Sequence, residues 1–287
     1  ITEIDKEYAV IHMSYVVESM NDKKSHYYQV DEYYNVTYNR SSEMVKLLAF
    51  DRYQESFFDS GYISKDRNSI SMGVTNDPAE YVTSEDYGIL AFVRLGQLWM
   101  YKYNDSSLTN IFSYPQDSFS DARTLNTNLD INIADMDADG NIYFVVYGYM
   151  NRGEHEGKNG MSLYYYSAEN MTTQELFFVE CDESYDIMKK ETGRFTYYNA
   201  QTNKFYYLLD ETLYEVSLAD MTQTALVEGI PSAKYFVSAN RKLVAYPNNA
   251  EDEQVTAITI QNFETGETYE KTCASGDLLL ALGFVEN

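Results

Sequence analysis

The feature that most constrains the fold is residues 129–170, where two strongly apolar strand patterns flank a polar loop. The segment reads LDINIADMDADGNIYFVVYGYMNRGEHEGKNGMSLYYYSAEN, with alternating polar and apolar residues before a DxDxDG turn. The runs of consecutive apolar and aromatic residues that follow are typical of strands covered on both faces. The segment therefore predicts an antiparallel unit with strands at 130–135, 141–149, 161–167 and 174–180.

Units of the same kind recur along the chain. One precedes this template at 79–115, and two follow it at 194–230 and 233–274. Their spacing is about 40 to 50 residues, in the range of propeller blades. Between units, residues 182–193 carry acidic residues first and lysines late, which predicts a helix of two turns. Outside the template, turns are predicted at 84–88, 95–97, 104–107, 199–203, 210–211, 219–222, 239–241, 248–252 and 264–266.

These units predict an all-β protein, a propeller of six or seven four-stranded blades. Blades packed face to face cover both faces of a strand such as NIYFVVYGY, whereas a two-layer sandwich usually leaves one face polar. We expect a single domain over 1–287, with regular blades at 62–274. Residues 1–61 are expected to be irregular, with strands at 8–17 and 27–38 joined by a polar link. An apolar strand in 275–287 would complete the closing blade together with the N-terminus.

The charge of the chain limits the classes of partner that it is expected to bind. The 45 acidic and 21 basic residues give a formal charge of −24, which repels phosphate backbones and anionic lipid surfaces. We therefore expect no nucleic-acid binding and no direct membrane insertion, and the sequence has no apolar run of about 18 residues. Cations, basic proteins and neutral glycans remain compatible with the charge. The alternative is that the charge only keeps a tyrosine-rich surface soluble.

The DxDxDG turn has two interpretations. Asp135, Asp137 and Asp139 alternate before a glycine, so that their carboxylates and Asn141 can converge on a hard cation such as Ca²⁺. The twelfth position of an EF-hand loop would need Glu, but Val146 stands there. The alternatives are therefore a structural Ca²⁺ site at these four residues and a metal-free Asp-Gly hairpin.

The polar loop at 150–160 is the segment of the chain that most resembles a binding site. It gathers Asn151, Arg152, Glu154 and His155 between glycines, and a loop on a rigid scaffold often carries function. An arginine can clamp a carboxylate and a histidine titrates near neutral pH. The alternative is a solvated connection that its own ion pairs hold down.

A second polar loop enters the same unit. It carries Asp121, Arg123, Asn126 and Asp130. In a propeller, the loop entering the first strand of a blade shares a face of the ring with the loop joining the second and third strands. We therefore expect both polar loops to form one ligand-binding rim, the alternative being that Asp121 and Arg123 only pair to hold a turn.

Two ten-residue matches resemble the repeat signature of TolB-like propellers. They are SEDYGILAFV at 84–93 and SANRKLVAYP at 238–247, and in both a turn would join the two inner strands of a blade. The loop YGYMNRGEHEGKNG is similar to a segment of uncharacterised extracytoplasmic proteins of gut Firmicutes. The resemblance implies a propeller located outside the cytoplasm, secreted or membrane-anchored, and implies no activity.

No known catalytic motif is present in the sequence, which lacks HExxH, CxxC, GxSxG, the P-loop and the dinucleotide fingerprint. We therefore expect a non-enzymatic extracytoplasmic propeller that binds a protein, peptide or glycan through loops on one face. The alternative is a carbohydrate-active hydrolase or lyase that uses paired carboxylates at the mouth of the channel. A third alternative is a purely structural spacer without a concave polar site.

Overall fold

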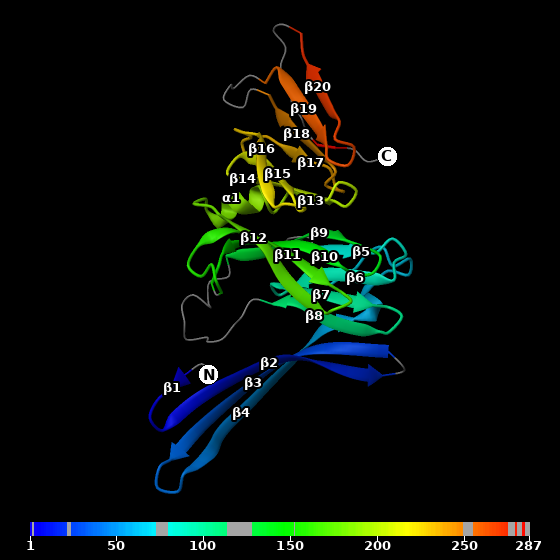
Figure 1. The fold of residues 1–287 in the computed structure, drawn as a ribbon. Coiled ribbons are helices and arrows are strands. Elements are labelled where there is room, and N and C mark those ends of the chain that lie inside the picture. The colour runs from blue at the N-terminus through cyan, green and yellow to red at the C-terminus, as the bar shows by residue number, and fades with distance from the viewer. Residues whose placement is uncertain are drawn as a thin grey trace. The chain divides into compact units, whose positions relative to one another are not determined.

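The structure, a computed structural model, describes residues 1, 3–21, 24–72, 80–113, 128–151, 153–248, 255–274, 279 and 283–284. Strands dominate this part of the chain and form five four-stranded antiparallel sheets (Figure 1). The all-β prediction is therefore confirmed. The chain divides into two compact units, Ile1–Thr127 with two of the sheets and Asn128–Asn287 with three.

The first sheet of the N-terminal unit is a long meander. Its strands are β1 (Glu3–Ile4), β2 (Tyr8–Asn21), β3 (Lys24–Asn39) and β4 (Met44–Asp59). The strands predicted at 8–17 and 27–38 lie within β2 and β3, but the expectation that residues 1–61 are irregular is wrong, because β2 spans 14 residues and β3 and β4 span 16 each. The polar link expected after 17 is part of the ladder, since Glu18 pairs with Tyr27. Strands with a solvent-facing side need no apolar residues there, so polar composition does not end them.

The second sheet of this unit has the turns that the sequence predicts. Its strands are β5 (Tyr81–Thr83), β6 (Ile89–Arg94), β7 (Gln97–Lys102) and β8 (Ser107–Ser113). The Ser84 hydroxyl donates to Asp86 at 2.6 Å and accepts from the Ile89 amide at 2.9 Å, which closes the turn between β5 and β6. Side chains of Ser and Asp often bond to nearby backbone in this way and thereby specify a turn.

The two sheets of the N-terminal unit pack through aromatic rings. Phe58 of β4 stacks on Phe92 of β6 with ring centroids 5.1 Å apart, and Phe57 contacts Trp99 at 4.8 Å. The Tyr27 hydroxyl donates to the Ser106 carbonyl group at 2.8 Å. Only the end of the long sheet that carries these rings is joined to the second sheet by this core.

The C-terminal unit contains three sheets in chain order. The strands of its first sheet are β9 (Leu129–Met136), β10 (Ile142–Tyr149), β11 (Asn159–Ser167) and β12 (Thr172–Glu180). The second sheet consists of β13 (Thr196–Asn199), β14 (Lys204–Leu209), β15 (Thr212–Ser217) and β16 (Thr222–Val227). The third consists of β17 (Phe236–Val237), β18 (Leu243–Pro247), β19 (Ala257–Asn262) and β20 (Thr268–Thr272). The predicted strands and turns of 129–274 are confirmed, except that residues 249–252 of one turn lie outside the described residues.

Helix α1 (Tyr185–Lys190) separates the first two of these sheets along the chain, as predicted. Asp186 lies in its first turn, and Lys189 and Lys190 lie in its last turn. This order complements the helix dipole, with negative charge at the N-terminus and positive charge at the C-terminus.

Side chains from facing sheets form continuous cores in this unit. Val145, Tyr147 and Leu163 of the first sheet join Phe205 and Tyr207 of the second, and all are buried. A second cluster joins the β13–β16 sheet to the β17–β20 sheet. The prediction that apolar strands are covered on both faces is therefore confirmed for β14, which contributes to both clusters.

The Ser-containing turn recurs in the third sheet of the C-terminal unit. The Ser238 hydroxyl donates to Asn240 at 2.8 Å and accepts from the Leu243 amide at 2.9 Å. These are the bonds that Ser84 makes, with Asn240 in the place of Asp86. The two matches to the repeat signature therefore form the same turn.

Each sheet is a four-stranded antiparallel meander, consistent with a propeller blade. The number of blades, the closure of the ring and the single domain stay predictions. Most of the segment 275–287 expected to close the ring lies outside the described residues.

Candidate functional site

The strands of the β9–β12 sheet bring several predicted site residues to one end. Leu129, at the start of β9, pairs with Gly148 near the end of β10, and Asn159, at the start of β11, pairs with Tyr149. The residue before β9 and the loop at 150–160 therefore lie at the same end of the sheet, as expected. Asp121, Arg123, Asn126 and Arg152 lie outside the described residues.

The loop at 150–160 is held against β12 by its charged residues. His155 Nε2 lies 2.7 Å from Glu175 Oε1, and the His155 ring stacks on Phe178 with centroids 3.9 Å apart. Lys158 Nζ donates to Glu180 Oε2 at 2.6 Å. His155 therefore already has a carboxylate partner, and the Lys158–Glu180 ion pair matches the alternative in which ion pairs hold the loop down.

The other predicted binding residues have different surroundings. Asn151 is buried, whereas Glu154 is exposed. Asp130 accepts a hydrogen bond from the Tyr185 hydroxyl at 2.9 Å, and its carboxylate lies 3.5 Å from Lys189 Nζ. Asp130 therefore ties α1 to β9.

The bonds of the DxDxDG turn are those of a hairpin. Asp137 Oδ1 accepts from the amides of Asp139 at 3.0 Å and Asn141 at 2.9 Å, and Asp137 Oδ2 accepts from Asn141 Nδ2. Burial raises the pKa of Asp135. Among the described residues, no group of three or more acidic, histidine or cysteine side chains is placed to hold a metal ion. These bonds form the Asp-Gly hairpin of one alternative, and the calcium site stays a prediction.

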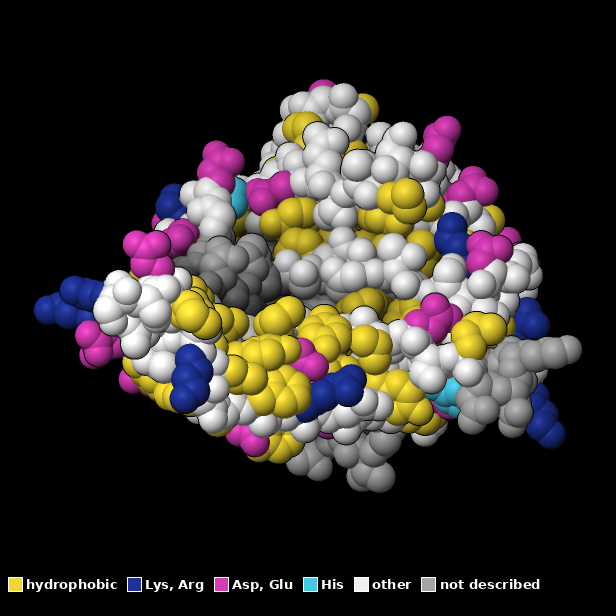
Figure 2. All heavy atoms as spheres, turned by 90° about the horizontal axis from the view of Figure 1, so that it is seen from below, with side chains coloured by type: hydrophobic (Ala, Val, Ile, Leu, Met, Phe, Trp, Pro, Cys, Tyr) yellow, Lys and Arg dark blue, Asp and Glu magenta, His cyan; other side chains and the backbone are white. Residues whose placement is uncertain are grey.

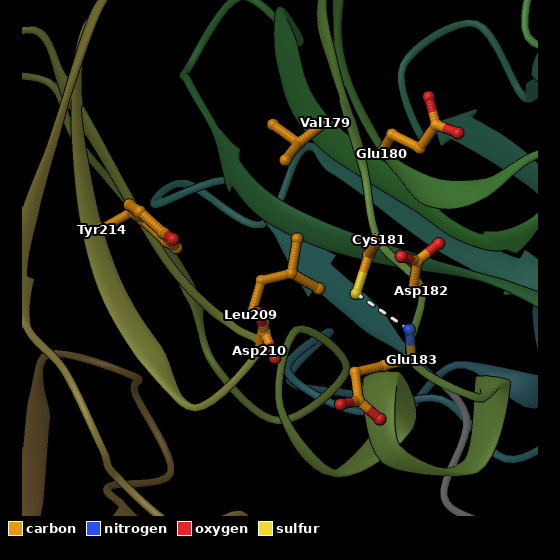
Figure 3. A pocket seen from close by; sticks show the side chains of 8 residues that line it. All are labelled: Val179, Glu180, Cys181, Asp182, Glu183, Leu209, Asp210 and Tyr214. Carbon is orange, nitrogen blue, oxygen red and sulfur yellow. Dashed lines mark hydrogen bonds between the residues drawn. The ribbon is translucent and has the colours of Figure 1, made fainter.

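A cavity of about 300 Å³ opens between β12 and the β14–β15 hairpin (Figure 3). Eight residues line it: Val179, Glu180, Cys181, Asp182, Glu183, Leu209, Asp210 and Tyr214. Half of these residues are carboxylates, and the others are Cys181 and three residues with apolar surface. Within the described part of the chain, Lys158 pairs with Glu180, and no lysine or arginine pairs with Asp182, Glu183 or Asp210.

Cys181 is a protonated thiol in this cavity. Burial, followed by the nearby carboxylates of Asp210 and Glu183, raises the pKa of the Cys181 thiol to about 11. The Glu183 amide donates to Cys181 Sγ at 3.4 Å (Figure 3). Since the thiolate is the nucleophile in cysteine chemistry, this site does not support a cysteine nucleophile at neutral pH.

A buried carboxyl group lies behind the cavity wall. Glu191 is fully buried, and its Oε1 accepts from the Glu211 amide at 3.2 Å. Its Oε2 has no hydrogen-bond partner among the described residues. Desolvation raises the pKa of Glu191 to about 7.

The turn above Glu191 has an uncommon backbone. Asp210 and Glu211 have φ angles of 51° and 53°, the left-handed values of a type I′ hairpin turn, which usually contains Asn or Gly. Glu191 bonds to this turn and thereby helps to place Asp210 in the cavity wall.

The amino-acid sequence does not reveal this cavity. Residues 210–211 were predicted only as a turn and 182–193 only as a helix. The available signals were the acidic run CDESYD directly after a strand and an Asp-Glu pair in a two-residue turn. Neither signal shows that the two segments meet, because sheet packing brings them together.

Comparison with known proteins leaves the family open. No family model and no curated protein matches the chain. Among solved structures, it is similar to the tricorn protease, with 11% identity over 92% of this chain and a TM-score of 0.39. It is also similar to dipeptidyl peptidase 4 of Porphyromonas gingivalis, with 12% identity over 89% of this chain and a TM-score of 0.43. The extracellular domain of BT4673 from Bacteroides thetaiotaomicron has 11% identity over 93% of this chain and a TM-score of 0.36.

The chain covers 25%, 39% and 29% of those three chains, respectively. Similarity at this level does not carry their activities to this protein. None of the helices in the described part of the chain has the length and apolar character needed to cross a membrane.

Proposed function

We propose that this chain is an extracytoplasmic β-propeller that binds a protein or peptide ligand without catalysing a reaction, and that the acidic cavity receives a basic side chain. The observation that carries the proposal is the set of three cavity carboxylates, Asp182, Glu183 and Asp210, without a lysine or arginine partner among the described residues. A lysine or arginine of the ligand would supply the missing positive charge.

The apolar part of the cavity suits the same ligand. Val179, Leu209 and Tyr214 line it beside the carboxylates. A lysine or arginine buries its methylene stem along apolar surface while its charged group meets an acidic one, and a guanidinium also stacks on tyrosine. A neutral glycan would leave these carboxylates partly desolvated without a counter-charge, which costs free energy.

The size of the cavity supports recognition of one side chain within a larger ligand. Its volume of about 300 Å³ is at the lower end for ligand pockets. The loop at 150–160 lies at the same end of the β9–β12 sheet and is linked to the cavity through Lys158 and Glu180. A protein or peptide ligand would contact this loop as well as the cavity.

Binding of short labelled peptides, measured by fluorescence anisotropy, tests the proposal. Four peptides differ at one position, which is Lys, Arg, norleucine or Glu. We expect the Lys and Arg peptides to bind and their affinity to fall with added salt, because charge attraction is screened. Asp210→Asn should weaken binding about tenfold, the loss of one charge-assisted contact.

Glu169→Gln is the matched control, since it removes an exposed carboxylate from the end of the β9–β12 sheet opposite the cavity. It should leave the affinity unchanged. Equal binding of the norleucine and Lys peptides would contradict the proposal. Release of reducing ends from a polysaccharide by the parent protein, but not by Asp210→Asn, would instead support a carbohydrate-active hydrolase or lyase that uses the cavity carboxylates.

A further inference from the structure

Strand β4 is an edge of the N-terminal sheet, whose order is β1-β2-β3-β4. Among the described residues, no strand pairs with its outer edge. An edge strand presents a row of backbone N–H and C=O groups that can pair with another strand. The outer edge of β4 is therefore a template for one more antiparallel strand.

The exposure of the β4 side chains changes abruptly along the strand. All of its residues from 44 to 56 are exposed, and burial begins only at Phe57. Edge strands of soluble proteins are usually short or covered, whereas this exposed stretch contains 13 residues.

Large apolar side chains are concentrated on this stretch. Val45 is 65% exposed, Leu47 51%, Phe50 46% and Tyr53 64%. Figure 2, seen from the side of this sheet, shows a broad band of hydrophobic side chains interrupted by a few charged ones. Val45, Leu47 and Phe50 lie on the same face of the sheet, and exposed apolar surface of this kind marks an interaction site.

The charges of the stretch indicate which partner fits. Lys46 and Arg52 balance Asp51 and Glu55, so the stretch is neutral within a chain of formal charge −24. Two copies of an acidic chain repel each other over most of their surfaces. A neutral apolar edge is a place where two copies can meet with little repulsion.

We infer that two copies of this chain associate through their β4 strands, which pair antiparallel about a two-fold axis at Phe50. The exposed stretch 44–56 is centred on Phe50, so this register covers all of it in both copies. The pairing is isologous and closed, as in most homodimers. The two N-terminal sheets then become one continuous sheet.

This register also places compatible side chains opposite each other. Phe50 faces Phe50 of the second copy and Ala49 faces Asp51, so that no like charges lie directly opposite each other at the axis. A register centred on Asp51 would oppose Asp51 to itself, which is destabilising. Strand β4 has a bulge at Leu48, where the β3–β4 register shifts. The bulge and the charged side chains of β4 limit the registers in which another strand can pair with this edge.

Sedimentation of the 287-residue chain over a concentration series tests the association. We expect a monomer–dimer equilibrium. Phe50→Asp places like charges opposite each other at the two-fold axis and should raise the dimer dissociation constant at least tenfold. Its matched control, Met171→Asp, changes an exposed residue of a turn in the other unit and should leave the equilibrium unchanged.

Cross-linking tests the register. In a Cys273→Ser background, Phe50→Cys should form a disulfide between copies, because residues directly opposite in antiparallel strands lie about 5 Å apart. Tyr53→Cys should not, since the two side chains would be six residues, or about 20 Å, apart. A monomer at every concentration would overturn the inference, and cross-linking of Tyr53→Cys as efficient as that of Phe50→Cys would overturn the register.

Discussion

At the scale of single residues, Glu191 shows how burial controls chemistry in this protein. Its carboxyl group is fully buried behind the cavity wall, with one oxygen bonded to the Glu211 amide. Desolvation raises its pKa to about 7, and the acidic side chains of Glu183 and Glu211 add to the shift. The group therefore changes charge close to neutral pH.

The shift makes stability depend on pH in a defined direction. Since the pKa rises from 4.5 to about 7 on folding, the folded state binds the extra proton between these values. The contribution of Glu191 to the free energy of unfolding is greatest below pH 4.5. It falls as the pH rises from 4.5 through 7, by at most about 3 kcal/mol. Glu191→Gln removes this titration.

Thermal unfolding of the parent and Glu191→Gln proteins from pH 4 to 8 measures the difference. The variant should gain stability relative to the parent as pH rises, because its side chain stays neutral. Parallel profiles for the two proteins would show that Glu191 does not titrate in this range.

The DxDxDG turn illustrates what single residues leave open. The same spacing of Asp135, Asp137 and Asp139 is compatible with a calcium loop and with a hairpin. The structure shows Asp137 bonded to the amides of its own turn, which sequence spacing alone does not determine.

At the scale of elements, strand β10 depends on close backbone approach at Gly148. This residue has a φ of 122°, and a Cβ there would lie 2.2 Å from the Asn128 carbonyl oxygen. No residue with a side chain fits without moving the start of β9. Gly153, in the loop that follows, also has a positive φ of 90°, but a Cβ there would meet nothing within 4 Å.

Two alanine substitutions separate steric clash from backbone strain. Gly148→Ala should cost about 3 kcal/mol, since it adds a clash to the strain. Gly153→Ala should cost about 1 kcal/mol, the strain alone. Urea unfolding followed by circular dichroism measures both, and equal costs would contradict the close approach at Gly148.

The elements of the C-terminal unit could be predicted because their signals are local. Turn residues such as 199–203 and apolar runs such as 204–209 specify hairpins within a few residues. The β1–β4 sheet could be predicted only in part, as strands at 8–17 and 27–38. Its long strands continue through polar residues such as Glu18 and Glu55, whose exposure depends on which parts of the sheet are covered.

At the scale of the whole molecule, the packing between sheets carries much of the stability. Phe263 is 2% exposed and contacts Phe195 and Tyr206 at centroid distances of 4.9 Å and 4.7 Å. These rings come from segments far apart in the sequence, and they join the β13–β16 sheet to the β17–β20 sheet.

Removing one of these rings should therefore destabilise the C-terminal unit. Phe263→Ala should cost about 3 to 5 kcal/mol through lost burial and a cavity. Tyr269→Ala, at a side chain that is 54% exposed on β20, should change stability by less than about 0.5 kcal/mol. Calorimetric unfolding of both variants measures the contrast, and a small loss at Phe263 would show that this interface is not a cohesive core.

The sequence by itself determined the strand class and most hairpins of 79–274, because these follow from local side-chain patterns. Only the tertiary structure decided that Cys181 and Asp210 line one acidic cavity and that β4 is an exposed edge. Both depend on which sheet faces pack together, and that packing joins residues whose separation along the chain carries no such signal.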